Sequence, residues 1–301
     1  MSSGNPFDVE PLIESAGPPP PPGSRRSRLF GDTLRQEGAK GVAIALVSTV
    51  VVVFLLVWVV VHSSNWPVVK QAFFNGQEFK DTFPEIARKF VRNIQYFMIA
   101  EVFILALALL LAVMRSLPGA VFFPIRLLAI VYTDLFRGLP LILVIYLLGF
   151  GMPSLALKGL PTSAAFWGIV GLILAYSAYV AEVYRAGIES VHPSQVAAAR
   201  ALGLSRWKSL RFVVIPQAVR RVVPPLLNDF IGLQKDTALL SIVIPFAEAF
   251  KQAQIDQSAD FNFTPVLCAA VLFLAITIPM TRVVDWLLVR QRARRQAGAV
   301  A

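Results

Sequence analysis

Several charged side chains lie inside or at the ends of long apolar segments, where a charge is costly unless it faces protein, water or a solute. They are Glu101, Asp134, Arg137, Glu182, Arg185, Asp229, Lys235 and Asp236. Together they offer both signs of charge, which a site for a small charged solute requires. We therefore treat them as candidates for binding a solute or lining a polar passage.

Local ion pairing is the alternative explanation for some of these groups. Asp134 and Arg137 are three residues apart, as are Glu182 and Arg185, so each pair falls on one face of a helix. For Arg185 we expect a structural ion pair. For Glu101 a structural and a functional role both stay open.

The segment from residue 222 to residue 244 is unusually polar for an apolar stretch. It contains Pro224-Pro225, Asn228-Asp229 and Gln234-Lys235-Asp236-Thr237. Irregular or proline-broken helices at membrane depth are tolerated where they are buried in protein or line a cavity. We predict that this segment lines a passage; a helix that begins late, with Lys235 at the outer interface, is the alternative. The predicted lining or gate groups are Arg137, Glu182, Asp229, Lys235, Asp236 and Thr237.

The sequence argues against enzymatic and metal chemistry. Cys268 is the only cysteine, and His62 and His192 are the only imidazoles. A cysteine-based zinc site and an intrachain disulfide are therefore excluded, and no set of Ser, His and carboxylate residues has catalytic spacing. The chain also lacks the G-x-x-x-x-G-K-[ST] loop that binds nucleotide phosphates. We predict no enzymatic activity and no cofactor or metal bound by this chain.

Long apolar helices must position the charged groups. Of the 301 residues, 56% are hydrophobic and 15% are charged, whereas soluble domains carry about 25% charged residues. The run Gly41–Val61 has the length of a membrane span and no charged side chain. We predict an all-α, multi-pass bundle with spans at about 42–61, 91–113, 127–150, 164–184, 222–244 and 266–289.

The basic residues orient these spans. Arg and Lys cluster before the first span, between the second and third, between the fourth and fifth, and after the sixth. Because cytoplasmic loops carry an excess of Arg and Lys, we predict that both termini are cytoplasmic. The same clusters account for the net charge of +10, so nucleic-acid binding is not expected.

These spans divide the chain into predicted parts. Residues 1–40 form a disordered, Pro/Arg-rich cytoplasmic tail, 41–62 an N-terminal transmembrane helix and 63–90 an extracytoplasmic loop. Residues 91–290 form the transmembrane domain, which includes a cytoplasmic loop at 186–212, and residues 291–301 form a basic cytoplasmic tail.

The loop between the fourth and fifth spans carries the clearest local signals. Pro193 and Ser194 predict a helix start with Ser194 as its cap. An Ala-rich helix over 195–202 should end at Gly203 in a left-handed conformation, and Ser205 should cap a second short helix. A compact helix pair with a small, smooth face is suited to docking a cytoplasmic partner.

The spacing in this loop resembles the EAA signature of bacterial ABC-importer permeases. Ala197-Ala198-Ala199 stands in the place of EAA, Gly203 is the glycine, and Val214-Ile215-Pro216-Gln217-Ala218 is the closing element. Three further stretches are similar to the polar amino-acid branch of that family. They are Phe136-Arg137-Gly138-Leu139-Pro140 (family pattern FRGTP), Glu182-x-x-Arg185-x-Gly187, and Lys235-Asp236-Thr237 (family pattern KDTSL). The matches cover about residues 90–290 in family order.

The resemblance implies a type I importer permease, with a core of five helices preceded here by one N-terminal transmembrane helix. It implies import of polar amino acids of the glutamate, glutamine and basic class across the bacterial cell membrane. The partners it implies are ATPase subunits that bind ATP and Mg, an extracytoplasmic amino-acid-binding protein and a second permease subunit, identical or paralogous. The loop helix would dock on the ATPase. The residues it assigns to this coupling are Ser194, Gln195, Ala197, Ala198, Ala199, Gly203 and Pro216.

Three positions depart from the family pattern. Ala197 replaces the motif Glu, Ser194 replaces a Gly, and Leu139 replaces the Thr of FRGTP. The missing carboxylate removes a possible charge-assisted contact, whereas coupling through the shape of the loop should persist. A self-contained secondary transporter or channel is the alternative function, although such proteins usually show internal repeats or paired interrupted helices.

Overall fold

The computed structural model describes residues 38–244 and 248–300, with side chains described between residues 41 and 290, and every regular element in these ranges is helical. The all-α fold is thereby confirmed. The predicted N-terminal tail, residues 1–40, lies almost wholly outside the described residues. The chain forms two units, residues 1–67 and 68–301, which are described separately.

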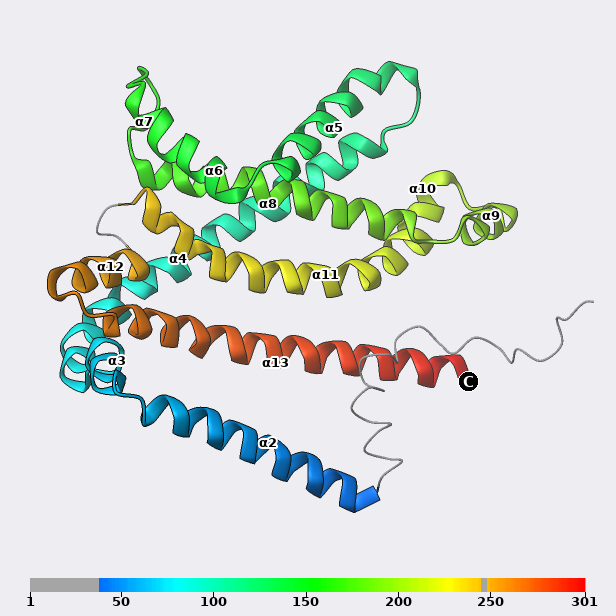
Figure 1. Cartoon of the computed structure of the whole chain (residues 1–301). Helices are drawn as coiled ribbons and strands as arrows, with labels where there is room; N and C mark the ends of the chain where they lie inside the picture. The colour runs from blue at the N-terminus through cyan, green and yellow to red at the C-terminus, as the bar shows by residue number, and fades with distance from the viewer. Residues whose placement is uncertain (1–37, 245–247, 301) are drawn as a thin grey trace, which may run out of the picture. The chain divides into compact units, whose positions relative to one another are not determined.

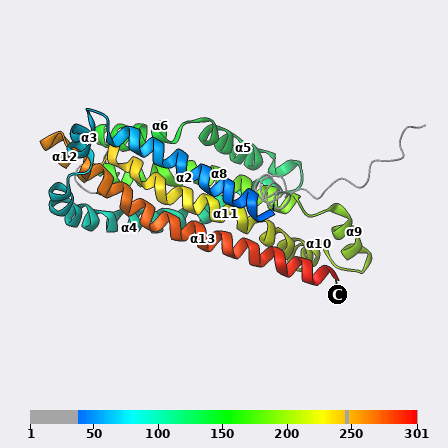
Figure 2. The same cartoon turned by 60° about the horizontal axis from the view of Figure 1, so that its bottom comes forward.

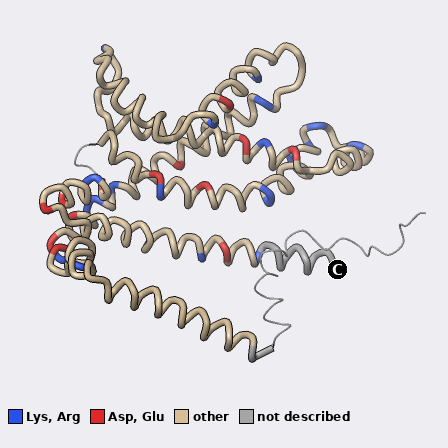
Figure 3. The backbone as a smooth tube through the Cα atoms, viewed as in Figure 1, with Lys and Arg blue, Asp and Glu red and all other residues tan. Residues whose placement is uncertain are grey.

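Helix α2 (Gly38–Val61) is the regular element of the first unit that lies wholly within it. It matches the predicted first span. Ile44 is 68% exposed and Leu56 63% exposed, and Figure 3 shows no charge along the described tube of this helix. A helix that is apolar on all sides is suited to lipid or to the interior of a large assembly.

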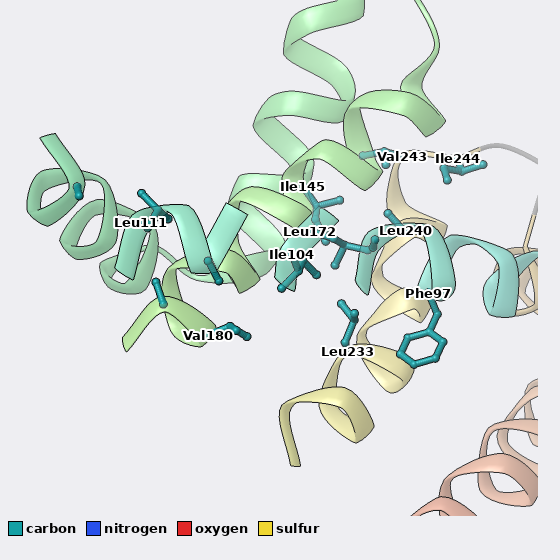
Figure 4. Packing of buried hydrophobic residues seen from close by; sticks show 14 residues of the cluster. Phe97, Ile104, Leu111, Ile145, Leu172, Val180, Leu233, Leu240, Val243 and Ile244 are labelled. Carbon is teal, nitrogen blue, oxygen red and sulfur yellow. The ribbon is translucent and has the colours of Figure 1, made fainter. Parts of the chain in front are cut away.

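In the second unit two long helices form the central pair. Helix α4 (Gly76–Ser116) contains the predicted second span, and helix α8 (Ala164–Glu189) contains the fourth. Their shared core includes Ile104 and Leu172, both 0% exposed, and Figure 4 shows it joined by Leu233 from α11. The predicted loop at 63–90 is mostly helical, because it holds helix α3 (Trp66–Phe73) and the first turns of α4.

Small residues on α8 let neighbouring helices approach it closely. A Cβ atom added at Gly171 would lie 3.3 Å from the Cα of Ile145, which belongs to helix α6 (Leu141–Tyr146). Burial of apolar surface at such contacts stabilises the bundle by roughly 25 cal/mol per Å².

The predicted third span, 127–150, is not one helix. Helix α5 (Phe123–Gly138) ends before Pro140, and α6 begins after it, so the two helical segments meet at an angle of 103°. The V-shaped pair is visible in Figure 1. Proline disfavours a helical conformation at the preceding residue, and Leu139 is extended with ψ 136°. The span predicted at 127–150 is therefore bent at Leu139 and Pro140. After α6 the chain continues through a π-helical turn, η2 (Leu147–Gly151), into α7 (Met152–Ser154).

Helix α11 (Ile215–Asp236) contains most of the predicted fifth span. Pro224 and Pro225 do not interrupt it, contrary to the expectation of a proline-broken helix. The break lies at Thr237 instead, where a 3₁₀ segment, η4 (Thr237–Ile242), takes over. Figure 2 shows α11 running beside α8 and α13.

The chain closes with helices α12 (Ala249–Asp260) and α13 (Thr264–Val300), the second of which contains the predicted sixth span. Among the described residues, four single helices are long and apolar enough to cross a membrane, and the bent pair of α5 and α6 adds a fifth candidate. Helix α11 is not among them, because its polar residues lower its hydropathy. The multi-pass class holds, while the count of six spans stays a prediction.

Candidate functional site

The loop between α8 and α11 folds as two short helices, α9 (Pro193–Ala201) and α10 (Arg206–Ser209), followed by a π-helical turn, η3 (Leu210–Val214). Ser205 caps α10 as predicted, accepting a hydrogen bond from the Lys208 amide at 3.3 Å. The predicted cap of α9 is wrong by two residues. His192 is the cap and accepts from the Ser194 amide at 3.2 Å, because Pro193 takes the first helical position.

Gly203 ends α9 in the left-handed conformation that the sequence predicts, with φ +80°. The Leu204 amide donates to the Ala199 carbonyl at 3.1 Å, and the Gly203 amide donates to the Arg200 carbonyl at 3.0 Å. These bonds satisfy carbonyls that the end of a helix leaves free. The turn between α9 and α10 is therefore well defined.

The loop presents an exposed apolar surface, which we call the docking surface: Ala197, Ala198, Leu202 and Trp207. Leu202 is 84% exposed and Trp207 64% exposed, and both alanines are also exposed. Of the predicted coupling residues, Ser194 and Gln195 are exposed beside this surface and Ala199 is buried. Pro216 lies outside it, in the first turn of α11. Exposed large apolar side chains that gather on one element mark a site for a partner.

The two helices that enter and leave the loop touch each other directly. A Cβ atom added at Gly187 on α8 would lie 2.0 Å from Cγ2 of Val222 on α11. Arg221 also donates to the Ser190 carbonyl, and Val191 packs with Val214 and Ala218 in a small core. The loop is thus attached to both helices by packing at its base.

Glu182 on α8 is the centre of a cluster of arginines from three helices, which we call the Glu182 cluster. Arg115 on α4 lies 3.0 Å from its carboxylate, Arg137 on α5 lies 3.9 Å away, and Arg185 on α8 forms a closer pair with it. Arg115 also donates to Thr133 at 3.2 Å. The expected pair of Glu182 with Arg185 is present, whereas Arg137 contacts Glu182 and not Asp134 among the described residues.

The break between α5 and α6 has a side-chain partner that the sequence did not indicate. The Tyr179 hydroxyl donates to the Arg137 carbonyl at 3.2 Å. That carbonyl has lost its helical partner, because the helix stops before Pro140. The Tyr179 hydroxyl therefore replaces the hydrogen bond that the Arg137 carbonyl lost at the point where the span is broken.

The remaining candidate residues lie along α11. Asp236 accepts a hydrogen bond from Tyr176 of α8 at 2.6 Å, and Lys235 is exposed. Asp229 is half-buried, and its Oδ2 atom has no hydrogen-bond partner among the described residues. Glu101 on α4 lies within electrostatic range of Asp229. The structure thus places these acids in one region between α4, α8 and α11.

A cavity of about 760 Å³ lies beside the coupling loop, between α4, α8, α10 and α11. Its lining is almost wholly apolar and includes Leu109, Ala112, Tyr184, Trp207, Val219 and Leu226. An apolar lining does not match a polar solute, so this cavity is distinct from the charged region that the candidate residues define.

A bent pair of apolar helices, charged groups between packed helices and an exposed loop are features of a membrane transport subunit. The chain matches the family model of the binding-protein-dependent transport system inner membrane component over residues 113–293, and it belongs to that family. The prediction of an ABC-importer permease is confirmed by this match, and with the apolar helices it supports a multi-pass protein of the plasma membrane.

Several known proteins are similar to this chain. The probable glutamine ABC transporter permease protein GlnP of Bacillus subtilis is 40% identical over 165 residues, which cover 54% of this chain and 74% of that protein. The glutamine transport system permease protein GlnP of Escherichia coli is 35% identical over 154 residues, covering 51% and 69%. A solved amino acid ABC transporter with histidines is 31% identical, with a TM-score of 0.62, covering 69% of this chain and 94% of that chain.

Proposed function

We propose that this chain is the permease subunit of an ABC importer that moves polar amino acids into the cell. The carrying observation is that residues 113–293 match the permease family, that the proteins similar to this chain include amino-acid permeases, and that the predicted turn at Gly203 is formed. A separate ATPase subunit binds ATP and Mg and supplies the energy, and this chain catalyses no reaction.

The docking surface is the proposed contact with the ATPase. Its exposed Leu202 and Trp207 supply apolar area, and the nearby Arg206 and Lys208 supply positive charge. This role requires the loop and both termini to face the cytoplasm, which the distribution of Arg and Lys supports. A second permease subunit and an extracytoplasmic binding protein complete the proposed importer.

The proposed passage runs beside α11, with Arg137, Glu182, Asp229, Lys235, Asp236 and Thr237 along or near it. An amino acid carries an ammonium and a carboxylate, so its site requires both signs of charge. Arg137 is 41% exposed and pairs with Glu182 at 3.9 Å, and among the described residues the buried Oδ2 of Asp229 has no hydrogen-bond partner. These two groups are our candidates for binding the carboxylate and the ammonium of the solute. The break between α5 and α6 supports this assignment, because interrupted helices mark binding sites in transporters.

Reconstitution tests the proposal. The chain would be placed in liposomes with a candidate ATPase and a candidate binding protein, and uptake of labelled amino acids would be measured with and without ATP. We expect uptake of a polar amino acid that requires ATP and both partners. Gradient-driven uptake by the chain alone would instead establish a secondary transporter.

A further inference from the structure

Buried polar side chains join four elements at the end of the second unit that lies away from the coupling loop (Figure 1). Asn93 on α4, Gln234 and Thr237 at the end of α11, and Glu248 before α12 are each at most 2% exposed. Polar groups this deeply buried are costly unless they are hydrogen-bonded. Their hydrogen-bond partners therefore indicate which elements the structure must hold in place.

Asn93 and Glu248 together cap the first turn of α12. Glu248 accepts hydrogen bonds from the Phe250 amide at 2.9 Å and from the Lys251 amide. Asn93 accepts from the Ala249 amide at 3.0 Å and donates to Glu248 at 3.1 Å. The first three amides of the helix, which have no partner within it, are thus all satisfied.

The same asparagine reaches the break at the end of α11. The Asn93 amide lies 3.4 Å from the Thr237 hydroxyl, which itself donates to the Gln234 carbonyl at 2.8 Å. Thr277 on α13 donates to the Gln234 side chain at 2.9 Å. Asn93 therefore contacts both α12 and the turn at Thr237.

Capping a helix with a buried carboxylate costs free energy, because burial removes the charged group from water. Glu248 forms no salt bridge in the described part of the chain, and burial raises its pKa although the bonds from Phe250, Asn93 and Lys251 act in the opposite direction. A fully satisfied buried network of this kind makes one arrangement of the helices much more favourable than others. The arrangement it favours here includes the position of Thr237.

We propose that Asn93 and Glu248 are positioning residues that hold the Lys235-Asp236-Thr237 turn in place against α4. Glu248 touches no solute and acts through Asn93, which contacts Thr237. The inference rests on the proposed function, because that function places this turn along the passage.

A pair of substitutions separates this role from a general loss of stability. Asn93→Ala removes the link to Thr237 and keeps the carboxylate of Glu248. Glu248→Ala removes the acceptor that orients the Asn93 amide. Because Glu248 acts through Asn93, the double variant Asn93→Ala/Glu248→Ala should disturb the turn no further than Asn93→Ala does.

Labelling of a cysteine beside the turn tests the proposal in the complete importer. Cys268 is first replaced by Ala, and Ala238→Cys supplies a half-buried reporter one residue beyond Thr237. We expect a thiol reagent to label this cysteine about tenfold faster than in the parent in both Asn93→Ala and Glu248→Ala, and no faster in the double variant than in Asn93→Ala. A cysteine at the exposed Ala186 on α8 is the control and should label equally in all three.

Parent-like labelling in Asn93→Ala, or additive acceleration in the double variant, would overturn the positioning role. Where Glu248→Ala does not accumulate, Asn93→Ala alone carries the test, since that variant removes the link to Thr237 and keeps the carboxylate cap. Labelling does not require transport, so a complex without amino-acid uptake would contradict the proposed function and leave this test intact.

Discussion

Glu182 shows how one carboxylate can hold three helices together. It lies between guanidinium groups of α4, α5 and α8, and its side chain is 22% exposed. Breaking a partly buried pair costs more than breaking a surface pair, because the remaining charge is left without a partner. Replacing the carboxylate leaves partly buried positive charges facing one another.

Glu182→Gln should therefore lower the free energy of unfolding by roughly 1–3 kcal/mol. Glu189→Gln is the matched control, because Glu189 also pairs with Arg185 but is 62% exposed. The control should change stability by about 0.5 kcal/mol or less. Thermal unfolding of the purified protein in detergent measures both, and equal shifts would show that Glu182 is no more than a surface partner.

Asp229 is the residue at which solute binding is most directly tested. Its buried Oδ2, which has no hydrogen-bond partner in the described part of the chain, is the proposed acceptor of a hydrogen bond from the ammonium of an amino acid. Asp229→Asn should raise the half-saturating amino-acid concentration about tenfold, which corresponds to about 1.4 kcal/mol of binding free energy. Asp285→Asn, on an exposed position of α13, is the control. Unchanged affinity in Asp229→Asn would remove this residue from the proposed site.

At the scale of elements, the contact between α8 and α11 controls how the coupling loop is held. Gly187→Ala places a methyl group where Val222 already lies, so it should destabilise the protein by about 1–3 kcal/mol. Val222→Ala removes that atom and leaves a Cβ at 3.4 Å. The double variant should recover most of the lost stability and uptake. A failure of Val222→Ala to compensate would place the damage elsewhere on α8.

The turn at Gly203 is a second element whose geometry matters. No atom lies within 4 Å of a Cβ added there, but φ is +80°. A β-branched side chain in that conformation costs about 1–3 kcal/mol of backbone strain. Gly203→Val should abolish ATP-dependent uptake and keep membrane insertion. The control Gly76→Val, with equal space and no left-handed φ, should leave ATP-dependent uptake unchanged. Normal uptake in Gly203→Val would mean that the docking turn lies elsewhere.

Local sequence signals predicted these elements to different degrees. The caps at Ser205 and Gly203 were predictable because they depend on a few adjacent residues. Gly138 and Pro140 were a sequence signal for the break between α5 and α6. The apolar run around them nevertheless led to the prediction of a span at this place. No local sequence signal indicated the contacts of Asn93 with Glu248, because 155 residues separate them and only the packed bundle brings them together.

At the scale of the whole molecule, the second unit has two distinct ends. Helix α9 and the docking surface lie at one end, and α12 lies at the other (Figure 1). With Cys268 replaced, a cysteine at the exposed Ala198 should react with a membrane-impermeant reagent only from the cytoplasmic side. A cysteine at the exposed Ala259 should react only from outside. The reverse pattern would invert the predicted orientation.

The cap of α12 also has a consequence for how the protein is made. Its first amides depend on Asn93, which is synthesised 156 residues before Ala249. Helix α4 therefore leaves the ribosome and enters the membrane long before its buried amide has a partner. The contacts between Asn93 and the first turn of α12 form only after residues 248–251 have been synthesised. Nascent chains that stop short of these residues therefore lack a contact that every finished chain contains.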